Sequence, residues 1–291
     1  MLLLHSMDAL RPGLRFVVVL GMFDGLHLGH QRILSITVRN ARAEGAEAVL
    51  LTFDPHPEAV LRGSRPPLLC DPAERLARFE QAGIGTTVVH PFDRQFASQS
   101  AEEFLRRLSM GRDLAGLVIT PETAFGRDRS GTTAVIEQLA PTIGYRVIHL
   151  PQQHSRGAPI SSSRLREQLA AGALDEVRRM LGRSYAVVGE LAEGERSLAG
   201  AVVDRIHQTV WLVLRAELAL PPEGAYAVRA WPISVGLLKP SLRLTGTATV
   251  EPQSAGEGVR GVRLSLSAGA LERAGRGTSS GRWRVEFLHP S

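Results

Sequence analysis

The sequence predicts an α/β protein with two domains: a doubly wound parallel-sheet (Rossmann-like) domain followed by a small antiparallel β-barrel. In the first part of the chain, short apolar runs alternate with helical stretches. After about residue 182 the helical periodicity disappears, and alternating runs separated by Gly and Pro take over. We therefore expect domains at 1–182 and 183–291.

Five apolar runs in the first domain are rich in β-branched residues and end near Gly, Pro or Asp, which is typical of buried strands. They are 16–20, 48–53, 86–89, 117–119 and 145–148. The helical stretches lie near 30–44, 72–82, 100–110 and 132–140. Repeated strand–helix alternation predicts a parallel sheet with helices on both faces.

Six runs in the second domain predict strands of a barrel. They are 185–188, 209–214, 225–228, 242–245, 262–266 and 283–287. A helix at 174–181 precedes the boundary, and we expect flexible loops at Ala255–Gly258 and Gly275–Gly281.

Composition excludes several classes of protein. With 44% hydrophobic and 22% charged residues, the chain is that of a globular protein rather than a disordered one. Cys70 is the only cysteine, so an intramolecular disulfide and a cysteine zinc site are excluded, which fits a reducing cytoplasm. No apolar run approaches the 20 or so residues of a membrane span, so we expect a soluble protein.

The basic residues argue against two further classes of protein, P-loop proteins and nucleic-acid-binding proteins. Lys239 is the only lysine among 34 basic residues, so the Gly-Lys-Ser/Thr run of a P-loop is missing. The net charge of +5 is spread thinly, and aromatic residues are only 5%, so nucleic acid is not an expected partner. We expect small-molecule substrates; the sequence does not indicate an oligomeric state.

The residues most suggestive of chemistry follow the first strand of this sheet, at Gly21–His30. Ligands of α/β sheets bind at the carboxyl ends of strands, and a helix start there offers free N–H groups to a phosphate. His27 and His30 are three residues apart at that helix start, where they can donate to phosphate oxygens, and Gly25 and Gly29 allow close approach of the backbone. The alternatives are a zinc-ligand pair or two surface histidines.

A second anion cradle is predicted at Ser161–Arg166, where serines cap a helix and arginines occupy its first turn. Arginines there oppose the helix dipole, which favours a role in binding. Taken alone, this helix start is also consistent with a simple cap.

The HxGH run at 27–30 and the SSSRLR run at 161–166 resemble the nucleotidyltransferase superfamily. Together with 52–57, 125–131 and 181–185, they resemble bacterial bifunctional riboflavin kinase/FAD synthetases. The resemblance implies transfer of AMP from ATP to FMN, or to a flavin-like phosphate, with Mg²⁺ and release of pyrophosphate.

The resemblance also implies roles for individual residues. It gives catalytic roles to His27, His30 and Arg166, the last for the departing pyrophosphate, and nucleotide binding to Gly21, Phe23, Asp24, Gly25, Gly29, Ser162, Ser163 and Arg164. It gives acceptor binding to Asp54, His56, Pro57, Glu122, Thr123, Phe125 and Arg127. Asp24 either positions the loop or the metal, or is an Asx-turn residue; His56 either borders the site or fills a rigid loop. The metal ligands are not identified.

Two departures from the family pattern bear on function. Glu122 and Thr123 stand where similar enzymes have an amide or acid and a phenylalanine, which puts the acceptor in question. The kinase signature is replaced by Leu198–Val203, and Gly261 stands in the place of a catalytic glutamate, so we expect a barrel without riboflavin kinase activity.

The expected function is that of an FMN adenylyltransferase. One alternative is a nucleotidyltransferase that uses another phosphorylated acceptor or nucleotide in a specialised pathway. The other is a non-catalytic flavin- or nucleotide-binding protein.

Overall fold

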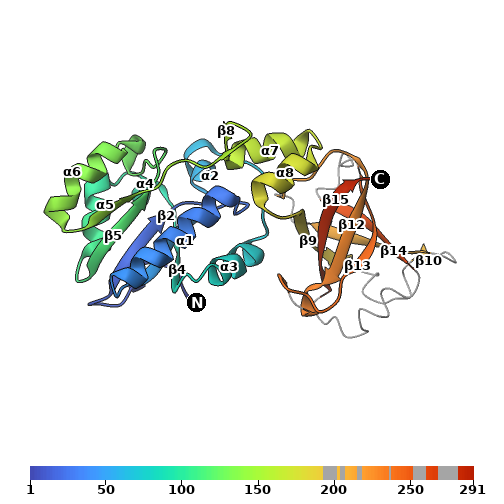
Figure 1. Cartoon of the computed structure of the whole chain (residues 1–291), viewed down its shortest axis with the longest axis horizontal. Coiled ribbons are helices and arrows are strands. Elements are labelled where there is room, and N and C mark those ends of the chain that lie inside the picture. Colours follow the sequence, from blue (N-terminus) through green and yellow to red (C-terminus); the bar gives the residue numbers. More distant parts are fainter. Residues whose placement is uncertain (193–201, 204–206, 215–217, 236, 252–259, 268–280) are drawn as a thin grey trace. The chain divides into compact units, whose positions relative to one another are not determined.

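The computed structural model confirms the predicted fold class (Figure 1). It describes residues 1–291 except 193–201, 204–206, 215–217, 236, 252–259 and 268–280. By their internal contacts the residues divide into two compact units, Met1–Pro66 with Arg78–Ile160, and Pro67–Ala77 with Ser161–Ser291. This division groups residues by contact, and the domain boundary at 182/183 stays a prediction.

The first unit contains a parallel sheet in the order β1-β4-β3-β2-β5-β6. Its strands are β1 (Leu2–Leu4), β2 (Arg15–Leu20), β3 (Glu47–Asp54), β4 (Thr86–Pro91), β5 (Asp113–Ile119) and β6 (Arg146–His149). A small hairpin follows, of β7 (His154–Ser155) and β8 (Ala158–Pro159). The five predicted strands are confirmed; the sequence analysis missed β1.

The helices between these strands are α1 (Leu28–Ala43), α2 (Pro57–Arg62), α3 (Pro72–Gln81), α4 (Arg94–Ala97), α5 (Ala101–Ser109) and α6 (Thr133–Ile143). The short helices α2 and α4 were not predicted. The predicted start at Ser100 is confirmed, because Ser100 and Glu103 form a reciprocal capping box.

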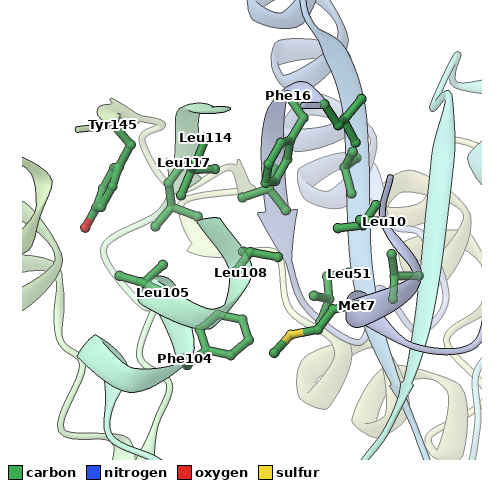
Figure 2. Packing of buried hydrophobic residues seen from close by; sticks show 14 of the residues in the cluster. Met7, Leu10, Phe16, Leu51, Phe104, Leu105, Leu108, Leu114, Leu117 and Tyr145 are labelled. Atoms are coloured by element: carbon green, nitrogen blue, oxygen red, sulfur yellow. The ribbon is translucent and has the colours of Figure 1, made fainter. Parts of the chain in front are cut away.

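Side chains alternate between the two faces of β2, and both faces are buried. Phe16 and Val18 belong to a core cluster formed with α5 and α6, which Figure 2 shows. Val17 and Val19 point to the opposite face and are also buried. Helix α1 contacts β2, β3 and β5 and covers that second face (Figure 1).

The second unit contains α7 (Ser162–Ala170), α8 (Leu174–Leu181) and an antiparallel barrel. The barrel strands are β9 (Tyr185–Leu191), β11 (His207–Leu214), β12 (Gly224–Pro232), β13 (Leu244–Val250), β14 (Arg260–Ser267) and β15 (Arg282–Pro290), with the two-residue β10 (Val202–Val203) paired to β11. A pairing between β9 and β11 closes the barrel. The six predicted strands are confirmed, whereas the loops expected at 255–258 and 275–280 lie outside the described residues.

Residues Pro67–Ala77 belong to the unit that holds the barrel, although they lie in the first half of the chain. Leu68 pairs with Leu218, and Ala219 donates its backbone N–H to the carbonyl of Leu68 at 2.8 Å. Arg284 of β15 donates two hydrogen bonds, of 2.9 and 3.0 Å, to the carboxylate of Glu74 in α3. Both side chains are about 2% exposed, so this is a buried ion pair.

Burial lowers the pKa of Arg284, but the charges and hydrogen bonds of Glu74 and Glu286 outweigh it and leave the pKa raised. Arg284 is therefore always charged in the folded protein, and its charge is neutralised within this cluster.

Candidate active site

The topology of the sheet locates the candidate site. From β2 the chain moves outward through β3 and β4, and it then crosses back to β5 on the other side of β2. Ligands of such sheets bind at the carboxyl ends of the two strands where the order reverses. Those ends lead into the loops 21–27 and 120–132, which hold half of the candidate residues.

His27 is the N-cap residue of α1. Its Nδ1 accepts a hydrogen bond of 3.2 Å from the backbone N–H of His30. An accepting Nδ1 carries no proton, so the neutral ring of His27 has its proton on Nε2. The cap thus fixes both the orientation and the tautomer of this imidazole.

Gly29 makes room for the ring of His27. A Cβ atom at position 29 would lie 3.0 Å from Nδ1 and 3.1 Å from Cε1 of His27. These contacts are tighter than ordinary van der Waals contacts, so a side chain at this position would push the imidazole away from the helix start.

His30 is held mainly by rings. Its imidazole stacks on that of His27, with centroids 3.6 Å apart and an interplanar angle of 19°. The ring of Phe23 meets it edge-on at 5.2 Å. Its buried Nδ1 has no hydrogen-bond partner. Burial, and secondly the neighbouring His27, lower the pKa of His30 well below the ordinary value, so the ring is neutral at pH 7.

The loop that carries this pair has an unusual backbone. Phe23 and Leu26 have φ angles of 50° and 41°, in the left-handed region that side chains disfavour, and Gly25 has 76°. Such strain costs of order 1–3 kcal/mol per residue and is concentrated at functional sites. Asp24 in the same loop is 2% exposed, and the choice between its two predicted roles stays open.

The residues after β3 form a second helix start. Asp54 ends β3 and is exposed, while Pro57 is the first residue of α2. The Nδ1 atom of His56 accepts a hydrogen bond of 3.2 Å from the backbone N–H of Glu58. His56 thus caps α2 as His27 caps α1, and it also presents a ring whose proton is on Nε2.

The two residues that depart from the family pattern lie after β5. The hydroxyl of Thr123 accepts a hydrogen bond of 2.8 Å from the backbone N–H of Thr120 and lies 3.2 Å from the Thr120 hydroxyl. Thr123 therefore closes the turn that follows the strand. Glu122 accepts a hydrogen bond through Oε1 from the side chain of Gln152, in the loop after β6. The sequence analysis missed Gln152, because no local pattern marks it.

Phe125 and Arg127 belong to a loop closed by reciprocal backbone hydrogen bonds between Phe125 and Gly131, of 3.3 and 2.9 Å. The loop packs so tightly on α5 that a Cβ at Gly126 would lie 2.7 Å from the backbone nitrogen of Ala101. The ring of Phe125 lies within this packing, whereas Arg127 is exposed.

The residues predicted at the second anion cradle belong to the unit with the barrel. Ser161 caps α7, its hydroxyl accepting from the backbone N–H of Arg164 at 3.2 Å, and Ser162 and Ser163 begin the helix. Arg164 forms an ion pair of 3.1 Å with the mostly buried Glu176 of α8.

The Nε of Arg166 donates to the carbonyl of Pro67 at 2.6 Å. Arg164 therefore links α7 to α8, whereas Arg166 links α7 to the segment that contains Pro67.

In the barrel, Gly261 lies beneath the ring of Trp211 on the neighbouring strand. A Cβ atom at position 261 would lie 2.1 Å from Cζ2 of Trp211, so no side chain fits there without movement of the indole. The place where the family resemblance puts a catalytic glutamate is therefore filled by Trp211. Residues 198–201 of the altered kinase signature lie outside the described residues.

Comparison with known proteins now identifies the family. The sequence profile of FAD synthetase matches residues 13–164, just over half of the chain, including the starts of α1, α2 and α7 but not Arg166. The chain belongs to the FAD synthetase family.

Relatives in the FAD synthetase family extend the match. A bifunctional riboflavin kinase/FMN adenylyltransferase from Bacillus subtilis is 30% identical over 218 residues, which are 74% of this chain and 67% of the relative. A putative enzyme of the same description from Geobacillus thermodenitrificans is 32% identical over 57% of this chain and 89% of its own.

A solved structure from Streptococcus pneumoniae, described as a macrolide-efflux protein, superposes with a TM-score of 0.79. It is 22% identical and covers 100% of this chain and 90% of its own, so it supports the two-part fold alone.

Two searches of the described residues gave negative results. No helix among them is long and apolar enough to cross a membrane. No group of three or more His, Cys, Asp or Glu side chains in the described part of the chain is close enough to hold a metal ion.

Proposed function

We propose that this protein is an FMN adenylyltransferase, which transfers AMP from ATP to the phosphate of FMN. A phosphate oxygen of FMN attacks the α-phosphorus of ATP and forms the new P–O bond. The bond from the α-phosphorus to the bridging oxygen breaks, and pyrophosphate leaves with the electron pair. The observation that carries the proposal is the His27–His30 stack at the start of α1, within the segment that matches the FAD synthetase family.

His27 and His30 serve as hydrogen-bond donors to the phosphates. The cap on Nδ1 of His27 leaves the proton on Nε2, which donates to a phosphate oxygen. Negative charge that develops during transfer is stabilised by such preorganised donors, each worth about 10²–10³-fold in rate. Gly21, Phe23, Asp24, Gly25 and Gly29 shape the loop that brings the triphosphate to them.

Arg166 receives the leaving pyrophosphate, with Ser162 and Ser163 beside it at the start of α7. Arg164 contributes less, because its guanidinium is held in an ion pair with Glu176, which also pairs with Arg179. Mg²⁺ commonly binds through substrate phosphates with one or two carboxylates, so in this proposal it enters with ATP and neutralises the phosphate charge.

Asp54, His56, Pro57, Phe125 and Arg127 border the acceptor in this proposal. A second candidate function, with another phosphorylated acceptor, is favoured by the contact between Glu122 and Gln152. This polar pair occupies the region where similar enzymes carry an amide or acid and a phenylalanine. Replacing both Glu122→Asn and Thr123→Phe tests it: improved use of FMN supports an altered acceptor, and loss of folding shows that Thr123 is needed for the turn.

We further propose that the barrel does not phosphorylate riboflavin. The support is the ring of Trp211 over Gly261, which leaves no room for a general-base carboxylate. The single cysteine supports a cytoplasmic protein. The match to the FAD synthetase family and the thinly spread charge support small-molecule substrates rather than nucleic acid, and the lack of a long apolar run argues against membranes.

The deciding experiment incubates the protein with Mg²⁺ and each nucleoside triphosphate, with and without FMN, and measures pyrophosphate release and product mass. FMN-dependent pyrophosphate and a product of the mass of FAD are expected with ATP. Binding of ATP and FMN without product would favour the non-catalytic alternative. FMN formed from riboflavin by protein free of contaminating kinase would overturn the proposal for the barrel.

A further inference from the structure

Phe79 lies outside every motif in the sequence, yet it contacts the candidate site. It is part of α3, in the segment that belongs to the first unit, and its side chain is fully buried. Its ring meets the ring of Phe23 edge-on, with centroids 6.0 Å apart and an interplanar angle of 83°. Phe23 in turn meets His30 edge-on at 5.2 Å. Four rings thus form a continuous series: Phe79, Phe23, His30 and His27.

Phe23 needs support from its surroundings. Its φ angle of 50° is one that a bulky residue holds only when neighbouring atoms enforce it. Gly21 leaves room for the ring of Phe23, since a Cβ at position 21 would lie 3.1 Å from it. Phe79 provides an aromatic contact to the same ring. Loss of Phe79 would leave this strained residue free to relax.

The orientation of His30 depends on these rings. Its Nδ1 is buried and has no hydrogen-bond partner among the residues that the structure describes, so none of them fixes the imidazole plane through that atom. Stacking on His27 still permits the ring to slide and rotate, whereas the edge of Phe23 restricts it. The titratable group whose charge lowers the pKa of His30 is His27, and α3 contributes the apolar ring of Phe79 to the series.

We propose that Phe79 is a positioning residue for adenylyl transfer, which acts through Phe23 to hold the imidazole of His30 in place. This inference rests on the proposed function. A displacement of about 1 Å in a positioned group can cost about 10²-fold in rate without contact between the mutated residue and the substrate. Phe79 never touches the nucleotide, so its effect falls on turnover rather than on binding.

The test compares Phe79→Leu with a matched control, Phe16→Leu. Phe16 is also fully buried in the first unit, but it lies near the start of β2, away from the loop that follows this strand. Both variants lose the same ring and volume. Phe79→Leu should lower kcat for FAD formation about tenfold with the KM for ATP changed less than about threefold. Phe16→Leu should lower the melting temperature and leave kcat near that of the wild type.

A second measurement reports on His30 directly. NMR titration of the His30 ring protons in the protein without nucleotide should show the pKa closer to the ordinary value in Phe79→Leu than in the wild type, because the ring is less tightly enclosed. Phe16→Leu should titrate as the wild type does. If Phe79→Leu fails to fold, Phe79→Met conserves volume without the ring and should give the same two shifts.

Equal kcat in Phe79→Leu and wild type, with the same His30 titration, would overturn the inference. An equal loss of kcat in both leucine variants would also overturn it, because general destabilisation would then explain the effect. A wild-type protein that forms no FAD would refute the proposed function instead, and the titration would still test whether Phe79 positions His30.

Discussion

Helix α1 and strand β14 each contain a glycine that makes room for a ring, with opposite consequences. Gly29 lets the imidazole of His27 fold over the start of α1, where the ring caps the helix and faces the candidate site. Gly261 lets the indole of Trp211 cover a position that similar kinases are expected to use for catalysis. The comparison teaches that the ring beside the glycine, rather than the glycine itself, decides the outcome. An imidazole there can serve the candidate site, whereas an indole blocks the position.

The largest expected effect on stability tests whether the barrel has a structural role. Glu74→Gln should lower the free energy of unfolding by about 3 kcal/mol, because it leaves Arg284 buried with only part of its counter-charge. The melting temperature should fall by about 10 °C in calorimetry. Glu80→Gln, at the exposed end of the same helix, is the control and should change it little. Equal shifts in the two variants would show that the buried pair is unimportant.

The second prediction concerns the functional side of the comparison. His30→Ala should lower kcat by about 10²–10³-fold, or roughly 2.7–4 kcal/mol, through loss of a donor to the phosphates. The control is His149→Ala, which removes an exposed histidine paired with Glu137. Near-normal turnover of correctly folded His30→Ala would contradict the role given to the stack.

The third prediction exchanges the two glycines for alanine. Gly261→Ala should destabilise the protein by about 1–3 kcal/mol, since its Cβ would overlap the ring of Trp211, and leave FAD formation unchanged. Gly29→Ala should leave the stability nearly unchanged, because the loss of the His27 cap is offset by the better helix propensity of alanine. It should lower kcat by about tenfold, because the new Cβ displaces the ring of His27. Thermal melts and steady-state kinetics on both variants check this. If Gly29→Ala were fully active, the close contact with His27 would be irrelevant to catalysis.

The smallest effect is a pH dependence confined to one unit. His90 is buried, its Nδ1 accepts the backbone N–H of Met7 at 3.1 Å, and burial followed by the charge of Arg107 lowers its pKa against the opposing effects of Asp8 and Asp93. As the pH falls below about 6.5, the unfolded chain therefore binds more protons at His90 than the folded protein does. The free energy of unfolding is highest above that pH and decreases as the pH is lowered.

His90→Gln should reduce this acid sensitivity, measured as the difference in melting temperature between pH 7.5 and pH 5. His289→Gln, an exposed histidine of the barrel, should leave it unchanged. An unaltered pH profile in His90→Gln would assign the effect to another group, with His30 the next candidate because its pKa is also lowered.

The sequence predicted the long elements well, because their patterns are strong. The run Phe16–Leu20 is apolar on both faces, and Ser100 with Glu103 marks a helix start. Short elements were missed: β1 has three residues and α4 four, too few to show a period. The fourth barrel strand begins at Leu244 rather than at 242, a difference within the usual uncertainty of strand ends.

The candidate site was predictable only in part. The histidines at positions 27 and 30 and the helix start at Ser161–Arg166 were visible as motifs. The loop after β2 was correctly placed at the carboxyl edge of the sheet. The ion pair of Arg164 with Glu176 joins residues twelve positions apart, on two separate helices. Nothing in the sequence around Phe79 distinguishes a ring that contacts the site from any other buried ring, since its partner Phe23 is 56 positions away in the chain and meets it only through tertiary packing.

The segment Pro67–Ala77 has a consequence for how this protein can be divided. Its carboxylates at Asp71 and Glu74 are buried against Arg282 and Arg284, both supplied by the last strand of the chain. A fragment that ended at residue 182 would keep the two acids and lose both of these arginines. The last strand of the barrel thus supplies positive charge to a segment from the first half of the chain, a role that does not depend on whether the barrel is catalytic.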